Sequence, residues 1–312
     1  MQNWKNQGTG VQQVDVLLFD AFSALCLANV IEPLRAANTM TGRAAYGWRF
    51  LTLDGGPAIS SSGMQVAVHG RLADHRGDIL VVMPSYDFLR HANGATSRAL
   101  RAAAKRYDIM AGLDTGSWVM AQAGLLEGRR ATIHWEELEQ FGEVFPDITV
   151  ERVRHVQDGN RITCGGALAA FDLVMELIGA RLGQAVRLDV ANLFMSGEAD
   201  SPQEVSLARS KSVARAVALM QANLEAPLSI GALAGHVGRS QKDLEARMHR
   251  DLGATPQTVY RRLRLNLAKK LVLETDLAVS EIALRCGYQD ASAMTRAYRA
   301  EFGSSPREMR RT

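Results

Sequence analysis

The sequence has few cysteines, few aromatic residues and no long apolar run. Its three cysteines, Cys26, Cys164 and Cys286, are too few and too far apart for a disulfide framework or a zinc site. Residues 1–10 are polar, and no stretch approaches the ~18 consecutive apolar residues of a membrane span. These absences favour a reducing, cytoplasmic location, and we expect no membrane partner, no metal and no cofactor.

The charges are unevenly distributed along the 312 residues, a length sufficient for two domains. Positions 209–312 contain 18 Lys and Arg against 10 Asp and Glu, whereas positions 1–208 contain 18 against 23. A basic end on an acidic body is typical of a polyanion-binding module joined to a domain that does not bind polyanions.

The C-terminal third contains one helical pattern twice, with the copies about 50 residues apart. Apolar residues fall at i, i+3, i+4 and i+7 in both copies, namely Ile230, Leu233, Ala234 and Val237, then Val279, Ile282, Ala283 and Cys286. Gly238 and Gly287 follow as turn residues, and Ser240 and Asp290 are the expected N-caps of the second helices. Two ordinary helical hairpins would give the same pattern. Duplication within a basic segment favours two helix-turn-helix units that bind double-stranded DNA.

The residues expected to contact DNA lie on the second helix of each unit. In the first copy they are Ser240, Gln241, Lys242 and Glu245, and in the second they are Ser292, Thr295 and Arg296. A single helix over residues 257–273 joins the copies. Its apolar ridge is expected to pack inward, leaving a set of basic side chains solvated: Arg261, Arg262, Lys269 and Lys270.

Residues 212–312 resemble the AraC-type DNA-binding domain. The second copy carries the motif in Ile282-Ala283, Gly287-Tyr288, Met294, Arg296, Tyr298, Phe302-Gly303 and Ser305-Pro306. The first copy has Ala246 and Met248 where the family has an arginine and an aromatic residue. We therefore expect the first unit to contribute less sequence discrimination than the second.

The N-terminal part alternates between apolar strands and amphipathic helices. Strands are expected at residues 14–19, 49–53, 65–69, 79–83, 108–113, 148–153 and 161–164, and helices at 24–40, 96–106 and, as a pair, 167–195. This order predicts an α/β doubly wound, mainly parallel sheet, followed by an all-α domain with two helix-turn-helix units. The expected domains are 1–195, a linker at 196–211, and 212–312.

Residues 110–118 run from an apolar strand straight into a helix, with Asp114 at the bend among small residues. This is the layout of a nucleophile elbow, which holds its central side chain over the edge of the sheet. Positions 14–195 resemble the PfpI-like, class I glutamine-amidotransferase-like fold, and the whole chain resembles GlxA-type regulators of the AraC family. The matching pieces are Phe22-Ser23, residues 32–38, the elbow, residues 123–132, His134-Trp135, and Gly165-Gly166 leading to Asp172-Leu173.

Enzymes of that superfamily carry a cysteine where this chain has Asp114, and an acidic partner near Cys26. The resemblance therefore implies a sensor pocket and no catalytic residues. The expected ligand-binding residues are Asp114, Thr115, His134, Trp135, Cys26 and Cys164. For His134 a ligand contact and a bond to a loop carbonyl both remain open. The alternatives to a ligand-responsive regulator are a PfpI-type hydrolase or amidotransferase tethered to DNA, and an architectural DNA-binding protein.

A carboxylate at the elbow either caps the helix N–H groups or faces a ligand, and in both cases it repels anions. A cation is attracted instead, and Trp118 or Trp135 would offer it an aromatic face. We expect a small nitrogen-containing metabolite as effector, with amino, guanidino or quaternary-ammonium chemistry. A second copy of the chain in a homodimer and RNA polymerase are the further candidate partners.

Overall fold

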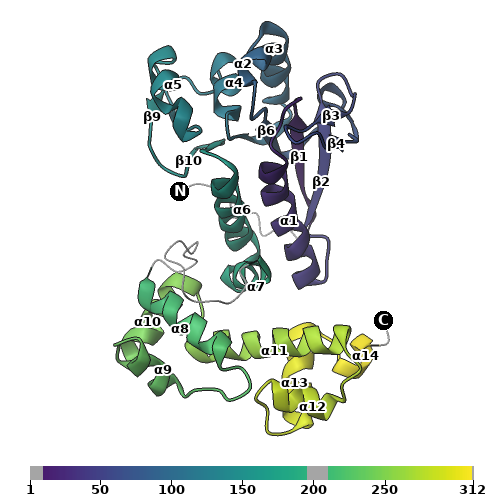
Figure 1. The fold of residues 1–312 in the computed structure, drawn as a ribbon, viewed down its shortest axis with the longest axis vertical. Coiled ribbons are helices and arrows are strands. Elements are labelled where there is room, and N and C mark those ends of the chain that lie inside the picture. Colours follow the sequence, from purple (N-terminus) through teal and green to yellow (C-terminus); the bar gives the residue numbers. More distant parts are fainter. Residues whose placement is uncertain (1–9, 195–209, 311–312) are drawn as a thin grey trace. The chain divides into compact units, whose positions relative to one another are not determined.

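The computed structural model describes residues 10–194 and 210–310, which form two compact units, Met1–Arg181 and Leu182–Thr312 (Figure 1). The expected linker, residues 196–211, lies almost entirely outside the described residues. The sequence places the end of the first domain at residue 195. Helix α7 (Gln184–Phe194) nevertheless belongs to the second unit, because it packs against the helices there.

The first unit is built on a seven-stranded sheet in the order β10-β11-β7-β6-β1-β2-β5. Its strands are β1 (Gln12–Leu18), β2 (Tyr46–Thr52), β5 (Gly70–Arg71), β6 (Gly77–Met83), β7 (Tyr107–Leu113), β10 (His155–Asp158) and β11 (Arg161–Cys164). Neighbours pair in parallel except β10 and β11. The predicted doubly wound, mainly parallel sheet is confirmed. The order reverses at β1, which lies between β6 and β2, and ligands in such sheets bind beyond the carboxyl ends of the strands at this point.

Two of the expected strands differ from the structure. Residues 65–69 are not one strand, because β4 (Gln65–Val66) pairs with β3 (Ala58–Ile59) in a local hairpin and the chain rejoins the main sheet only at β5. The expected strand at 148–153 is reduced to β9 (Thr149–Val150), which pairs with β8 (Arg130–Ala131) in a separate sheet. Strand β10 was not expected.

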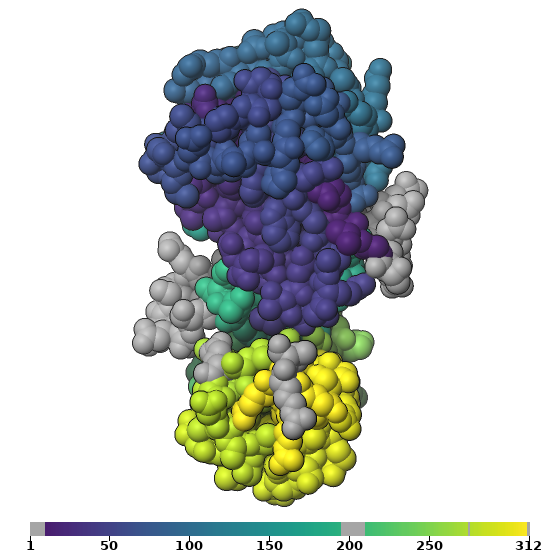
Figure 2. Space-filling model, turned by 90° about the vertical axis from the view of Figure 1, so that its right-hand side faces the viewer, coloured from purple at the N-terminus to yellow at the C-terminus, as the bar shows by residue number. Residues whose placement is uncertain are grey.

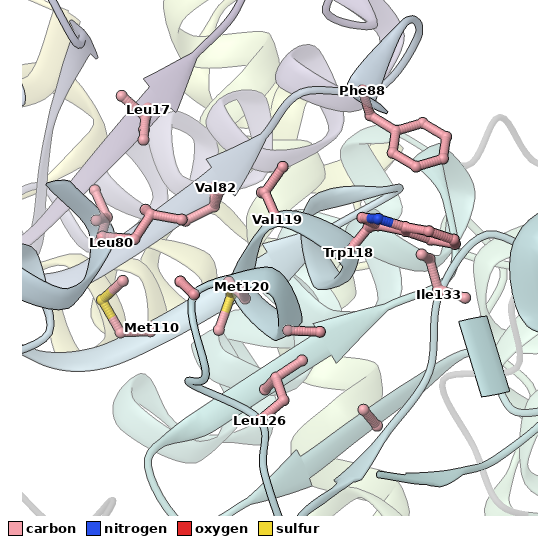
Figure 3. Close-up of a cluster of buried hydrophobic side chains, with 14 of the residues drawn as sticks. Leu17, Leu80, Val82, Phe88, Met110, Trp118, Val119, Met120, Leu126 and Ile133 are labelled. Carbon is pink, nitrogen blue, oxygen red and sulfur yellow. The ribbon is translucent and has the colours of Figure 1, made fainter. Parts of the chain in front are cut away.

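Helices cover both faces of the main sheet. Leu80 and Val82 of β6 pack into a core with α3 (Gly94–Ala103) and α4 (Gly116–Gln122), and this core also includes residues of α2 (Phe88–His91) and α5 (Leu138–Val144) (Figure 3). The alternate residues Ile79 and Val81 face α1 (Ala24–Thr41) and α6 (Ala167–Leu182). This alternation is the period of two expected of a strand buried on both faces.

The second unit contains two small cores joined by α11 (Pro256–Glu274). The first holds residues of α7, α8 (Lys211–Ala222), α9 (Ile230–His236) and α10 (Gln241–Leu252), and the second holds residues of α12 (Val279–Arg285), α13 (Ala291–Phe302) and α14 (Pro306–Arg310). Helix α11 contributes to both cores, and Figure 2 shows its lime surface beside the yellow surface of the last helices. Within the described ranges, no helix has the length and apolar character needed to cross a bilayer.

Candidate functional site

Asp114 stands at the tight bend between β7 and α4, as the sequence predicts. Its φ of 61° lies in the left-handed region, which a non-glycine residue rarely adopts. The bend is close because of Gly116, where a Cβ would lie 2.1 Å from the carbonyl oxygen of Val82 in the neighbouring strand. The strand–turn–helix geometry of a nucleophile elbow is therefore present, with a carboxylate as its central side chain.

Three loops that follow neighbouring strands are tied together around the elbow. Ala21, Ser85 and Asp114 follow β1, β6 and β7, and each has a positive φ. The Thr115 hydroxyl donates to the Ser85 carbonyl at 2.6 Å, and the Tyr86 N–H donates to the Ala21 carbonyl at 3.3 Å. Sequence reasoning missed Ser85, because only the pairing of β6 with β7 brings it beside Asp114.

The Asp114 carboxylate is held without a cationic partner of its own. In residues 10–194 and 210–310 no Lys or Arg forms an ion pair with it. Burial raises the pKa of Asp114, and the Ser85 hydroxyl and His134 oppose this rise. Ser85 is itself buried, and among the described residues its Oγ has no hydrogen-bond partner of ordinary geometry. A ligand with a positive charge would satisfy this carboxylate.

The two thiols expected at the site are fully buried. Cys26 of α1 and Cys164 at the end of β11 are both 0% exposed. Burial, reinforced by the charge of Asp114, raises the pKa of Cys26 well above its usual value, and burial raises the pKa of Cys164 to about 12. Both thiols are therefore protonated at neutral pH and are poor nucleophiles.

His134 and Trp135 line an open pocket of about 470 Å³ next to the elbow. The rest of its wall comes from the neighbours of these two residues, the segment after β9, the turn after β11 and the start of α6: Ile133, Leu138, Arg152, Val153, Arg154, Gly165, Gly166, Ala167, Leu168 and Ala169. The backbone N–H of His134 donates to the backbone carbonyl of Asp114 at 3.2 Å, and the ring Nδ1 of His134 lies 3.6 Å from Glu136 Oε2. Asp114 therefore adjoins this pocket through His134 without being part of its wall.

The two tryptophans considered at the site have different surroundings. Trp135 is 64% exposed at the pocket, and its ring centroid lies 5.8 Å from that of His134. Trp118 is buried in the core against Phe88, Phe141 and Phe145, and Figure 3 shows it among apolar side chains. Trp135 is thus the aromatic face that a ligand in the pocket can reach.

The second unit contains two helix-turn-helix pairs, α9–α10 and α12–α13. Gly238 and Gly287 have φ values of 66° and 69° in the inter-helix turns, as expected. The Ser240 hydroxyl accepts from the Asp243 N–H at 3.2 Å, and the Asp290 carboxylate accepts from the Ala293 N–H at 2.7 Å, so both N-caps are present.

The candidate DNA-contacting residues lie on the outer sides of α10 and α13. Gln241, Lys242, Ser292 and Arg296 are exposed, as is the capping Ser240, whereas Glu245 and Thr295 are partly buried. Across the described residues, Lys242 and Arg296 make no ion pair or side-chain hydrogen bond, unlike the neighbouring Arg247 and Arg299. Exposed cations without a partner in the protein are suited to phosphates and base edges.

The two outer faces differ in charge. Gln241 donates to Glu245 at 3.0 Å, and Asp243 pairs with both Arg239 and Arg247. Helix α10 therefore presents carboxylates next to Lys242, whereas the first ten residues of α13 contain no acidic side chain. The larger contribution of the second unit to recognition stays a prediction, and this difference in charge is a physical reason for it.

Helix α11 is more deeply packed than a single apolar ridge predicts. Arg262 and Lys269, expected to be solvated, are instead partly buried: Arg262 pairs with carboxylates, and Lys269 lies 5.2 Å from the ring centroid of Phe302. Arg264, which the sequence did not single out, donates to the carbonyls of Cys286 and Gly287 at 2.7 and 2.6 Å. A cation at this position caps the C-terminal end of α12 and fixes its turn.

Fold and site together define a two-unit regulator type: an α/β unit with an elbow and a pocket, followed by paired helix-turn-helix units. Residues 233–312 match the family described as "Helix-turn-helix domain". The chain is 35% identical over 303 residues to the HTH-type transcriptional regulator CdhR of Pseudomonas aeruginosa, covering 94% of this chain and 90% of that protein. It is 30% identical over 311 residues to the HTH-type transcriptional regulator GlxA of Rhizobium meliloti, covering 96% of each. The chain belongs to the AraC-type transcriptional regulators of the GlxA and CdhR kind.

Solved structures similar to the first unit show the same fold. An AraC family transcriptional regulator from Pseudomonas putida matches with a TM-score of 0.52 and 21% identity, covering 59% of this chain and all of that one. Drosophila melanogaster DJ-1beta matches with a TM-score of 0.51 and 17% identity, covering 60% and 100%. The expected PfpI-like fold is thus confirmed.

Proposed function

We propose that this DNA-binding transcriptional regulator responds to a small effector with an amino, guanidino or quaternary-ammonium group, held beside Asp114 without covalent turnover. The uncompensated carboxylate at the elbow carries the proposal. Its carboxyl group is partly desolvated and forms no ion pair with a Lys or Arg among the described side chains, and Trp135 offers an exposed aromatic face at the adjoining pocket.

No observation favours the alternative of a PfpI-type hydrolase or amidotransferase tethered to DNA. Asp114 occupies the position of the cysteine nucleophile, and burial keeps the thiols of Cys26 and Cys164 protonated. In the proposed mechanism the Asp114 carboxylate attracts the cationic group of the effector, with Ser85 and His134 as its polar neighbours, and the adjoining pocket holds the rest of the effector. The ligand-binding roles of Asp114, Thr115, His134 and Trp135 are part of this proposal, whereas Cys26 and Cys164, which the sequence also suggested, are fully buried and do not line the pocket.

Asp114→Asn tests the effector. Asparagine keeps the size of the side chain and tolerates a positive φ, so the elbow keeps its shape while the charge is removed. Two unit charges 4 Å apart interact by roughly 4 kcal/mol at the effective dielectric near a protein surface, so we expect at least about a tenfold loss of affinity. A thermal-shift screen of amino acids, guanidino compounds and quaternary-ammonium compounds identifies the compound, and calorimetry on both proteins measures the loss.

The affinity for the effector should also depend on pH. Because burial raises the pKa of Asp114, the carboxylate is protonated at a higher pH than an ordinary carboxyl group. Affinity for a cation should therefore fall in the parent protein as the pH decreases through that pKa, and should stay flat in Asp114→Asn. Equal affinity of the two proteins for the compound, or an effector that is purely anionic, would refute the proposal.

DNA binding is proposed to involve both helix-turn-helix units on one face of the duplex. Helix α11, with 19 residues, spans about 28 Å, which is close to the ~34 Å between successive major grooves. Footprinting should reveal two protected segments about one helical turn, or ~10 base pairs, apart. Protection of one groove only, over about half a turn, would contradict this geometry.

We further propose that the chain acts as a homodimer in the cytoplasm and contacts RNA polymerase there. Two-fold symmetry would match paired half-sites, since operators commonly mirror the symmetry of the proteins that bind them.

A further inference from the structure

Helix α7 is packed into the second unit through both apolar and polar contacts. Leu188 lies in the core formed with α8, α9, α10 and α11. On the same helix, the Asn192 side chain accepts a hydrogen bond from Gln221 of α8. Although α7 precedes the region that resembles the AraC-type domain, it is part of the same compact body.

Asp189 of α7 connects three helices of this unit. Its carboxylate is 3% exposed and accepts from Arg262 Nε at 2.7 Å and from Asn266 Nδ2 at 2.5 Å, both on α11. Arg262 also pairs with Glu301 of α13 at 3.3 Å. One buried carboxylate thus links α7, through α11, to the second DNA-reading helix.

Among the described residues, no such link joins α7 to α10, the second helix of the first helix-turn-helix unit. Asp251 of α10 is the counterpart of Glu301 in the repeat, yet it pairs with its chain neighbour Arg250 at 3.2 Å. Asp251 is buried. Helices α10 and α13 thus both carry an acidic residue at this position of the repeat, and they differ in the partner of its carboxylate. The connection from α7 therefore reaches α13 specifically.

A buried ion pair of this kind fixes geometry more than it adds stability. Burial raises the pKa of Asp189, and the Arg262 guanidinium opposes this shift. Because the cost of desolvating the two charges largely offsets their attraction, the ion pair adds little net stability, and its main effect is to fix how the paired groups are oriented. If Asp189 lost its charge, Arg262 would keep only Glu301 as an ionic partner, and the position of α13 along α11 would be less strictly defined.

We propose that α7 is a positioning arm of the DNA-binding unit and that Asp189 holds α13 at the spacing from α10 that successive major grooves require. This inference rests on the proposed two-groove function. A single residue, Gly183 with a φ of 92°, separates α7 from α6, whose first residues line the pocket. The arm therefore directly follows, in the chain, the helix that begins at the candidate effector site.

The test measures spacing preference with the full-length chain. A duplex of about 30 base pairs, or roughly three helical turns, is selected from a random library by the parent protein, and one or two base pairs are then inserted between the protected segments. Each inserted base pair rotates one half-site by about 34° relative to the other, so the parent protein should bind the altered duplexes at least about tenfold more weakly. Asp189→Asn should bind the original duplex more weakly and should discriminate among the spacings by less than about threefold.

Two further variants make the result specific. Arg262→Gln removes the other, more exposed partner of the same ion pair and should relax the spacing preference in the same way. It tests the proposal even if Asp189→Asn folds poorly. Asp251→Asn removes a buried carboxylate of the first reading helix and should keep the parent preference. Retention of the parent preference by Asp189→Asn or by folded Arg262→Gln overturns the proposal. A parent protein with no spacing preference contradicts the two-groove function itself, and this outcome is visible without any variant.

Discussion

Arg296→Ala is expected to lower affinity for the selected DNA by about 1–3 kcal/mol, the usual value of a base-specific side-chain contact. Arg296 is exposed on α13 and, unlike the other arginines of α10 and α13, has no ionic partner within the described residues. Its side chain is therefore available to DNA without first breaking a contact in the protein. Gel-shift or fluorescence titration of the parent and variant proteins measures the change.

The pattern of loss distinguishes the two kinds of contact. A base contact should relax the preference at one position, whereas a phosphate contact should weaken all sequences alike and reduce the salt slope by about 1. Arg299→Ala is the matched control, because Arg299 lies on the same helix but pairs with Glu308 at 2.9 Å. We expect Arg299→Ala to bind nearly as the parent does. Binding by Arg296→Ala that equals the parent would rule out both roles.

Lys242→Ala tests the ranking of the two units. Lys242 lies beside the carboxylates of Asp243 and Glu245, and Ala246 stands where the second copy has Arg296. Lys242→Ala should therefore cost less sequence selectivity than Arg296→Ala. A larger loss of selectivity from Lys242→Ala would reverse the ranking.

Gly287→Ala is expected to be the more destabilising of two equivalent glycine substitutions. Gly238 and Gly287 occupy the same turn in the two copies and have nearly the same positive φ, so each alanine incurs about 1–2 kcal/mol of backbone strain. At Gly287, however, a Cβ would lie 2.6 Å from the Leu224 carbonyl oxygen and 2.7 Å from Pro227 Cγ, whereas at Gly238 nothing lies within 4 Å. Overpacking should add about 1–3 kcal/mol at Gly287 alone.

Urea denaturation of the full-length parent and both variants measures this difference. Gly238→Ala is the matched control, since it introduces the same methyl group at the same φ without the collision. The loop from Leu224 to Pro227 precedes the first helix-turn-helix, so the contact at Gly287 also couples the two copies. Equal destabilisation by the two variants would show that the loop moves aside at no cost.

Local sequence patterns predicted the features that depend on neighbours within a few residues. The left-handed glycines at 238 and 287, the caps at Ser240 and Asp290, and the bend at Asp114 were all found where expected. Each depends on backbone conformation or a hydrogen bond within one helical turn, which residue type determines directly.

Features that depend on distant partners were not predictable in this way. The segment at 65–69 contains the strand-favouring residues Val66 and Val68, but its first two residues pair in a hairpin with Ala58–Ile59 rather than with the main sheet. Exposure at the pocket also depended on packing: the sequence offered both Trp118 and Trp135 as an aromatic face for a ligand, yet of the two only Trp135 lines the pocket. Strand propensity and apolar character do not specify which other part of the protein a strand or side chain packs against.

The duplicated helix-turn-helix units, the α/β class of the first unit and the carboxylate at the elbow could be predicted from the sequence, because they depend on local periodicity and residue type. The packing of distant segments places Ser85 beside Asp114, buries the thiols of Cys26 and Cys164, and pairs Arg262 with Asp189 instead of leaving it solvated. Asp189 and Arg262 are 73 residues apart in the chain. Such partners meet only when helices pack, and the periodicity of either helix carries no information about the other's position.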